Sequence, residues 1–170
     1  MKIFNRTVLM PLLLCALAPL SAHAEPYAGL GVSRVDTSTS SGLDTGDANG
    51  ITLYGGNRFD YYGFEIGYSD LGDIDVPQTP FVITGHILKL QAIFFTNVSD
   101  DLLLLAKLGI AQPDIESNFG YSYSDTEFAW AVGMNYQFSE RLGFRVEYEA
   151  YDDMDGLDLN LLSFSLNTTF

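Results

Sequence analysis

Seven charged side chains recur at alternate positions among small or apolar residues, a spacing that suits ion-pair chemistry inside an enclosed space. They are Arg58, Glu65, Lys89, Lys107, Arg145, Glu147 and Glu149. Four are cationic and three are anionic, so together they are almost neutral. A charge removed from water is costly unless it is paired and hydrogen-bonded. The pattern predicts a structural network of salt bridges, with a gated or narrow ion path as the alternative.

Catalytic chemistry has little support in the sequence. His86 is the histidine outside the N-terminal segment, and no serine lies near it in the sequence to form a nucleophile–base pair. No HExxH sequence and no glycine-rich phosphate loop is present. The acidic run at Asp153, Asp155 and Asp158 has the spacing of part of a calcium loop but lacks the distal glutamate, so these are weak metal candidates. We therefore predict no catalytic residue and no cofactor.

The elements that carry the charges are best seen between Glu127 and Tyr151. Phe128, Trp130, Val132, Met134, Tyr136 and Phe138 alternate with Ala129, Ala131, Gly133, Asn135 and Gln137. After the turn at 139–141, Leu142, Phe144, Val146 and Tyr148 alternate with Gly143, Arg145, Glu147 and Glu149. A period of two residues predicts two strands joined as a hairpin.

The same alternation predicts six further strands. Their expected ranges are 27–35, 51–58, 61–71, 86–96, 102–111 and 157–170. The four leucines at 102–105 obscure the alternation in one of them, and there the inner face is expected to be partly apolar. The glycines and alanines on the charged faces fit a crowded interior, so we expect the large residues to face outward. A soluble barrel such as a lipocalin would have the opposite arrangement.

The expected connections alternate between long and short, and the long ones are strongly acidic. Thirteen carboxylates and no lysine or arginine fall in the long loops: Asp36, Asp44, Asp47, Asp70, Asp73, Asp75, Asp114, Glu116, Asp125, Asp152, Asp153, Asp155 and Asp158. The whole chain carries a formal net charge of −14, which argues against nucleic-acid binding. A solvated, repelling surface is the simpler interpretation, and the gathering of divalent cations by several of these carboxylates is the alternative.

Residues 1–24 have the features of a cleaved secretory signal peptide. Lys2 and Arg6 precede an apolar stretch at 8–20, and Ala22-His23-Ala24 provides a small-residue cleavage site. The single cysteine, Cys15, lies within this segment, so the mature chain from residue 25 is expected to lack thiols and disulfides.

The signal peptide, the eight alternating strands and the closing stretch LLSFSLNTTF together resemble the small OmpA/OmpX-type outer-membrane barrels. The resemblance implies an all-β fold, an eight-stranded antiparallel up-and-down transmembrane β-barrel over residues 25–170, with both termini periplasmic. It also implies that Leu162, Phe164, Leu166 and Phe170 form the signal read by the outer-membrane assembly machinery.

The expected function is a non-enzymatic one in the outer membrane of a Gram-negative bacterium. It would be structural, or would act through the acidic outer loops on an unidentified extracellular partner, with membrane lipid and lipopolysaccharide as the surroundings. A narrow porin-like channel is the alternative, and a lipid A-modifying enzyme is a third possibility that would require partners for His86. Fold-level analogy does not choose among these functions.

Overall fold

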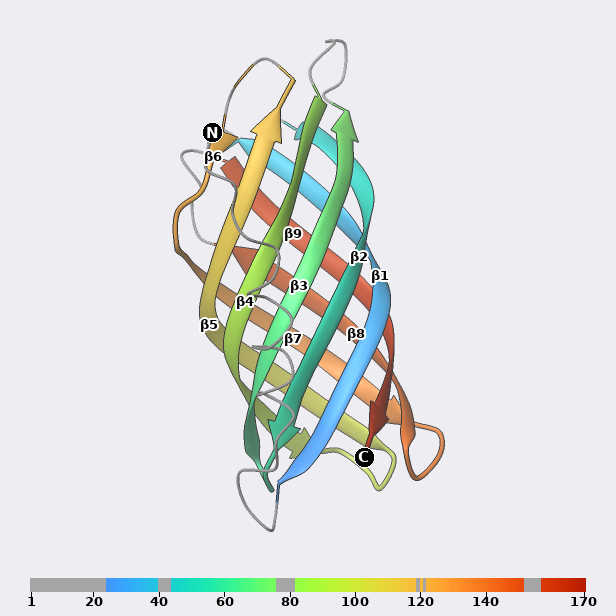
Figure 1. Cartoon of the computed structure of the whole chain (residues 1–170). Helices are drawn as coiled ribbons and strands as arrows, with labels where there is room; N and C mark the ends of the chain where they lie inside the picture. Colours follow the sequence, from blue (N-terminus) through green and yellow to red (C-terminus); the bar gives the residue numbers. More distant parts are fainter. Residues whose placement is uncertain (1–23, 40–43, 76–81, 119, 121, 152–156) are drawn as a thin grey trace.

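The structure is a computed structural model that describes residues 24–39, 44–75, 82–118, 120, 122–151 and 157–170. Within these residues the chain forms a barrel of eight long strands and one two-residue strand (Figure 1). The strands are β1 (Glu25–Thr39), β2 (Asp44–Arg58), β3 (Tyr62–Asp75), β4 (Val82–Asn97), β5 (Leu102–Ser117), β6 (Ser122–Tyr123), β7 (Glu127–Gln137), β8 (Leu142–Tyr151) and β9 (Leu157–Thr169). The predicted eight-stranded antiparallel barrel is confirmed.

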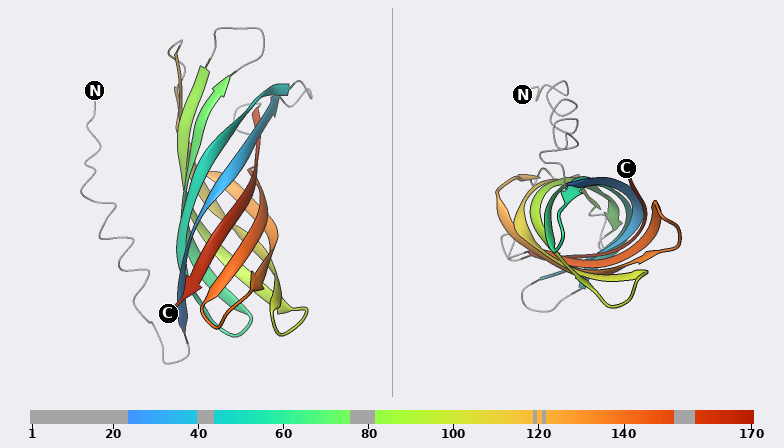
Figure 2. Two further views of the ribbon diagram at one scale, coloured as in Figure 1. Left: turned by 90° about the vertical axis from the view of Figure 1, so that its right-hand side faces the viewer. Right: turned by 90° about the horizontal axis from the view of Figure 1, so that it is seen from below.

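Every long strand pairs antiparallel with its neighbours in the chain, and β1 pairs with β9 to close the barrel. Tyr27 lies opposite Thr169 at one end of this seam and Thr39 lies opposite Leu157 at the other. The short β6 adds to the edge of β5 through Ile115 and Glu116. Viewed along its axis, the barrel is a closed ring (Figure 2). Among the described residues, no helix is long and apolar enough to cross a membrane.

Short turns occupy one end of the barrel, as predicted. They join β2 to β3, β4 to β5 and β7 to β8. The turn between β7 and β8 is fixed by Ser139, whose hydroxyl accepts the backbone N–H of Leu142 at 3.0 Å. β1 begins and β9 ends at this same end (Figure 1).

The predicted strand ends at the opposite end of the barrel were wrong, because several strands are longer than expected. Asp36 to Thr39 belong to β1 and Asp44 to Gly50 to β2, where a long loop was predicted. β5 likewise continues to Ser117, through the first part of another expected loop. Polar side chains replace apolar ones on the outward face there, but strand pairing continues because it depends on backbone N–H and C=O groups. Apolar side chains such as Val35 and Ile115 lie on the inward face instead.

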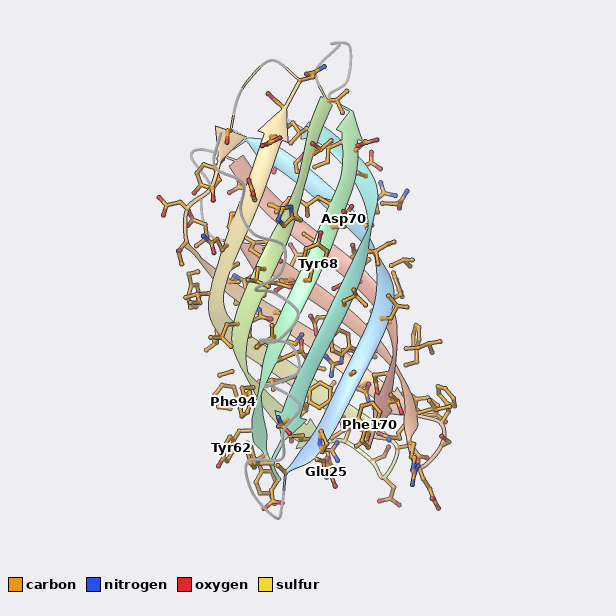
Figure 3. All side chains as sticks on the ribbon, viewed as in Figure 1. Glu25, Tyr62, Tyr68, Asp70, Phe94 and Phe170 are labelled. Atoms are coloured by element: carbon orange, nitrogen blue, oxygen red, sulfur yellow. The ribbon has the colours of Figure 1, made fainter. Side chains whose placement is uncertain are left out.

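The outward faces carry the bulky residues through most of the barrel. Leu30 is 57 % exposed and Leu166 is 60 % exposed, whereas Ala129 and Ala131 on inward positions are buried. Tyr62, Phe94 and Phe170 lie on the outside near the short turns, and Tyr68 lies nearer the other end with Asp70 beyond it (Figure 3). Such a band of outward apolar side chains with aromatic residues at its edges is typical of a membrane-spanning barrel.

Candidate functional site

Four charged side chains meet in the middle of the barrel interior. Lys107 on β5 donates to Glu65 on β3 at 2.5 Å and to Glu147 on β8 at 2.7 Å. Arg145 donates to the second oxygen of Glu65 at 2.7 Å and lies 3.8 Å from Glu147. All four are almost fully buried. The cluster has two positive and two negative charges, so its members neutralise one another without solvent.

Two tyrosines complete this cluster, and the sequence interpretation did not include them. The Tyr27 hydroxyl donates to Glu65 at 2.9 Å. The guanidinium of Arg145 lies over the Tyr54 ring, 4.2 Å from its centroid, and the Tyr54 hydroxyl is 2.9 Å from the Ser165 hydroxyl. A guanidinium stacked on an aromatic ring is held by a cation–π attraction that strengthens away from water. The alternation of residues on β1 and β2 places both tyrosines on the inward face, and this was the sequence signal that could have identified them.

A second, smaller group of buried charges lies beside the first. Lys89 on β4 and Glu149 on β8 form an ion pair at 2.5 Å, and the Gln91 side-chain amide donates to the other Glu149 oxygen at 2.8 Å. This pair is also neutral. The six residues Glu65, Lys89, Lys107, Arg145, Glu147 and Glu149 thus divide into two self-compensated groups, which we call the charge layer.

Arg58, the seventh predicted residue, lies apart from the charge layer. It pairs with Glu25 at the short-turn mouth, and its side chain remains 30 % exposed. Its guanidinium also lies 5.9 Å from the centroid of the Phe95 ring. Glu25 precedes the first alternating residues of β1, which is why the pattern did not identify it. One cavity at this mouth, which Arg58 and Glu25 line, has a volume of about 20 Å³, enough for about one water molecule.

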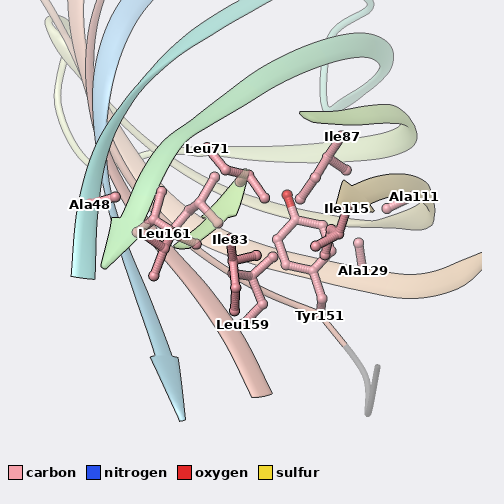
Figure 4. Close-up of a cluster of buried hydrophobic side chains, with 12 residues drawn as sticks. Ala48, Leu71, Ile83, Ile87, Ala111, Ile115, Ala129, Tyr151, Leu159 and Leu161 are labelled. Atoms are coloured by element: carbon pink, nitrogen blue, oxygen red, sulfur yellow. The ribbon is translucent and has the colours of Figure 1, made fainter. Parts of the chain in front are cut away.

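An apolar cluster fills the interior on the side of the charge layer away from the short turns (Figure 4). We call it the apolar plug. Its members are Val35, Ala48, Leu71, Ile74, Ile83, Ile87, Ala111, Ile115, Ala129, Tyr151, Leu159 and Leu161, with Tyr123 packed against them. Leu161 lies directly opposite Glu149 in the strand register, so the plug is in contact with the charge layer.

A β-bulge in β3 gives the plug one of its residues. Asp70 pairs with His86 and Asp73 with Thr84, so β3 has one residue more than β4 over this interval. The extra residue changes the phase, and both Leu71 and Ile74 are buried although they are three positions apart. Gly72 has a φ of +67°, and a Cβ there would lie 2.3 Å from the Asn49 carbonyl oxygen. The bulge therefore requires glycine at this position.

A third interior layer lies between the charge layer and the short turns. Ile93, Phe95 and Leu105 are buried together, with Leu103 packed against them. This confirms the expectation that the leucine run places apolar side chains on the inner face of that strand. On its short-turn side the charge layer therefore borders both these apolar side chains and the buried polar residues Asn57, Asn135 and Asn167, a mixture that the sequence interpretation did not foresee.

The acidic residues beyond the apolar band lie largely on strands and not in loops. Asp36, Asp47, Asp70, Asp73, Asp114 and Glu116 are exposed on the extended parts of β1, β2, β3 and β5. Arg34 is exposed among them and forms ion pairs with Asp36 at 3.3 Å and Asp47 at 3.0 Å. The expected placement of these carboxylates in loops is therefore corrected. Asp152, Asp153 and Asp155 lie outside the described residues.

The remaining candidates are dispersed. His86 is exposed on β4, with its ring 5.6 Å from that of Tyr68 and its Nε2 4.0 Å from the Asp114 carboxylate. Asp158 lies in β9, and the described residues contain no group of three or more metal-binding side chains suited to a metal ion. The residues expected to form the assembly signal, Leu162, Phe164, Leu166 and Phe170, occupy alternate outward positions at the end of the chain.

A family model described as "Outer membrane protein beta-barrel domain" matches residues 7–170, and the chain belongs to this family. It is an outer-membrane β-barrel protein.

Several solved barrels have a similar fold. Ail of Yersinia pestis, solved with the heparin analogue sucrose octasulfate, aligns with a TM-score of 0.66 at 14 % identity, over 87 % of this chain and 99 % of that one. Neisserial surface protein A aligns with a TM-score of 0.67 at 14 % identity, over 86 % of this chain and 99 % of that one. The N-terminal barrel domain of Pseudomonas aeruginosa OprF aligns with a TM-score of 0.60 at 14 % identity, over 84 % of this chain and 97 % of that one. No match was found among the curated proteins.

Proposed function

We propose that this protein is a sealed, non-conducting barrel with a structural or surface-interactive role and no catalytic activity. The observation that carries the proposal is the layered interior. Ions would have to cross the apolar plug and then a charge layer in which Glu65, Lys107, Arg145 and Glu147 are already ion-paired with one another. An apolar constriction resists wetting, and paired charges leave no free site for an ion.

The orientation follows from the usual plan of bacterial barrels, with short turns in the periplasm and long connections outside. Residues 1–24 would be the cleaved signal peptide, and both termini of the mature chain would be periplasmic. Leu162, Phe164, Leu166 and Phe170 would present the signal to the assembly machinery. The extended acidic strands would then project beyond the membrane.

The surface role would use these acidic strand extensions. Arg34 is the one lysine or arginine among the exposed carboxylates of this region in the described chain, and it is already paired. A partner would therefore be cationic, or would bind through divalent cations. The sulfated sugar in the Ail structure carries the same sign of charge as this surface, and we do not expect it to bind here.

Planar lipid bilayer recording tests the sealed interior. The purified mature protein, with insertion verified by heat-modifiable migration on a gel, is expected to give no current steps of reproducible size. The matched variant replaces Leu161 and Ile87 by glycine and also Glu65 and Lys107 by serine, which opens both the plug and the charge layer, and it is expected to give steps of current. Reproducible steps from the unmodified protein would contradict the proposal and favour the narrow channel.

A further inference from the structure

A groove on the outer surface of the barrel crosses the seam between β1 and β9, close to the short-turn end. It is a shallow, open depression with a volume of about 400 Å³. Its lining is uncharged: Ala28, Gly29, Leu30, Leu53, Leu142, Leu166, Asn167 and Thr168. Ala28 lies opposite Thr168, which in turn lies opposite Leu142. These small side chains form the floor, and the paired Leu30 and Leu166 form one wall.

The groove lies within the apolar outer band, so its occupant must be apolar. A second copy of the chain is a poor candidate. A stable protein–protein interface buries about 800 Å² on each partner, whereas this groove is bounded by eight residues. A single flexible acyl chain fits the groove without needing a large complementary surface.

A cation that forms no ion pair in the described part of the chain directly precedes Leu142, which lines the groove at its short-turn end. Six lysine and arginine residues fall in the described part of the chain, and five of them form ion pairs within 4.0 Å. The sixth, Arg141, is exposed and forms no ion pair with any described residue. It directly precedes Leu142, and its carbonyl oxygen accepts the Thr169 N–H at 2.9 Å, so its backbone adjoins the strand that forms the groove floor.

We propose that this groove binds one anionic phospholipid, with an acyl chain along Ala28 and Thr168 and the phosphate group at Arg141. The assignment rests on the orientation proposed above, which places the short turns in the phospholipid leaflet. Arginine is suited to phosphate because its guanidinium donates two parallel hydrogen bonds. Glu140, the neighbouring acidic residue in the turn, weakens the attraction without pairing with Arg141. The lipid seals the seam where the first and last strands meet.

Native mass spectrometry of the mature protein tests the site, with phosphatidylglycerol or phosphatidylcholine of equal chain length as the probe. The unmodified protein is expected to retain one phosphatidylglycerol preferentially. Ala28→Leu fills the floor and is expected to weaken this retention about tenfold. Arg141→Gln is expected to retain both lipids alike, because the acyl contact remains and the cation that favours the net negative headgroup over the zwitterionic one is lost.

Ala92→Leu is the matched control, since Ala92 also faces outward but lies on β4, away from the groove. It is expected to retain phosphatidylglycerol like the unmodified protein. Equal retention by the two leucine variants would overturn the proposal, and so would an unchanged lipid preference in Arg141→Gln. Dimers abolished by Ala28→Leu would instead assign the groove to a second copy. Bilayer recording of the same samples separates this outcome from failure of the sealed-interior proposal, because the groove does not open into the lumen.

Discussion

The strands of this barrel pass through two regions that differ in which face is apolar. In one region the apolar side chains lie outside the barrel, and in the other they lie inside. On β4, Lys89 and Gln91 are buried inside the charge layer, and Leu90 between them is 51 % exposed on the outside. Further toward the long connections, Ile83 and Ile87 are buried inside, and Thr84 and His86 are exposed. β1 shows the same reversal, from Leu30 outside to Val35 inside.

The reversal shows that the surroundings, and not the strand itself, determine which face is apolar. Where acyl chains surround the barrel, apolar side chains cost nothing outside, and the narrow interior is filled by compact paired groups. Where water surrounds it, the strands follow the rule of soluble proteins and bury a hydrophobic core. Backbone pairing continues unchanged through both regions. The apolar plug is therefore the core of the water-exposed extension.

The largest expected effect comes from breaking the charge layer. Glu65→Ala leaves Lys107 and Arg145 buried with only Glu147 to compensate them. Removing one member of a buried ion pair typically costs about 3–5 kcal/mol, because an uncompensated charge remains. We expect the free energy of unfolding in phospholipid vesicles to fall by this amount, measured by urea titration with Trp130 fluorescence.

Glu116→Ala is the matched control in the other region, since Glu116 is exposed on the outside of β5. Its change in unfolding free energy is expected to stay within about 0.5 kcal/mol. Similar losses for the two variants would contradict the comparison, because they would mean that solvent reaches the charge layer as freely as it reaches the surface.

The next largest effect concerns the two faces of one strand. Ile87→Ala removes a fully buried side chain from the plug and is expected to cost about 3 kcal/mol, through lost transfer free energy and the cavity left behind. Leu90→Ala, three residues away on the lipid-facing side, is expected to cost less than about 1 kcal/mol, because acyl chains fill the space. The same vesicle titration measures both. An equal or larger loss for Leu90→Ala would place Leu90, and not Ile87, in the packed core.

The alternation of residue types was sufficient to predict the barrel, its strand order and the inward phase of Glu65, Lys107 and Arg145. It could not predict where pairing ends, because a polar strand in water and a polar loop have similar composition, as at Asp44 to Gly50. It also could not predict the plug, since Ile74 joins it only through the bulge at Gly72. Which inward charges meet depends on register across strands, and for this reason Arg58 pairs with Glu25 and not with the charge layer.

The smallest expected effect is that of the ion pairs around Arg34. They allow a direct comparison of the two regions, because the buried charge layer contains ion pairs between the same kinds of groups. Arg34 and Asp47 are 3.0 Å apart, but each side chain is 58 % exposed. Water screens such a pair, and side-chain entropy opposes it, so exposed pairs contribute about 0.2–1 kcal/mol.

A double-mutant cycle with Arg34→Gln and Asp47→Asn is expected to give a coupling energy in this range. Raising the salt concentration from 0.1 to 1 M shortens the screening length from about 10 to about 3 Å and should reduce the coupling further. The coupling between Glu65 and Lys107, measured in the same way, should barely respond to salt, since both side chains are almost fully buried. A salt-independent coupling at Arg34 would mean that the extension of β1 and β2 is shielded from water, and the boundary between the two regions would have to move outward past Asp47.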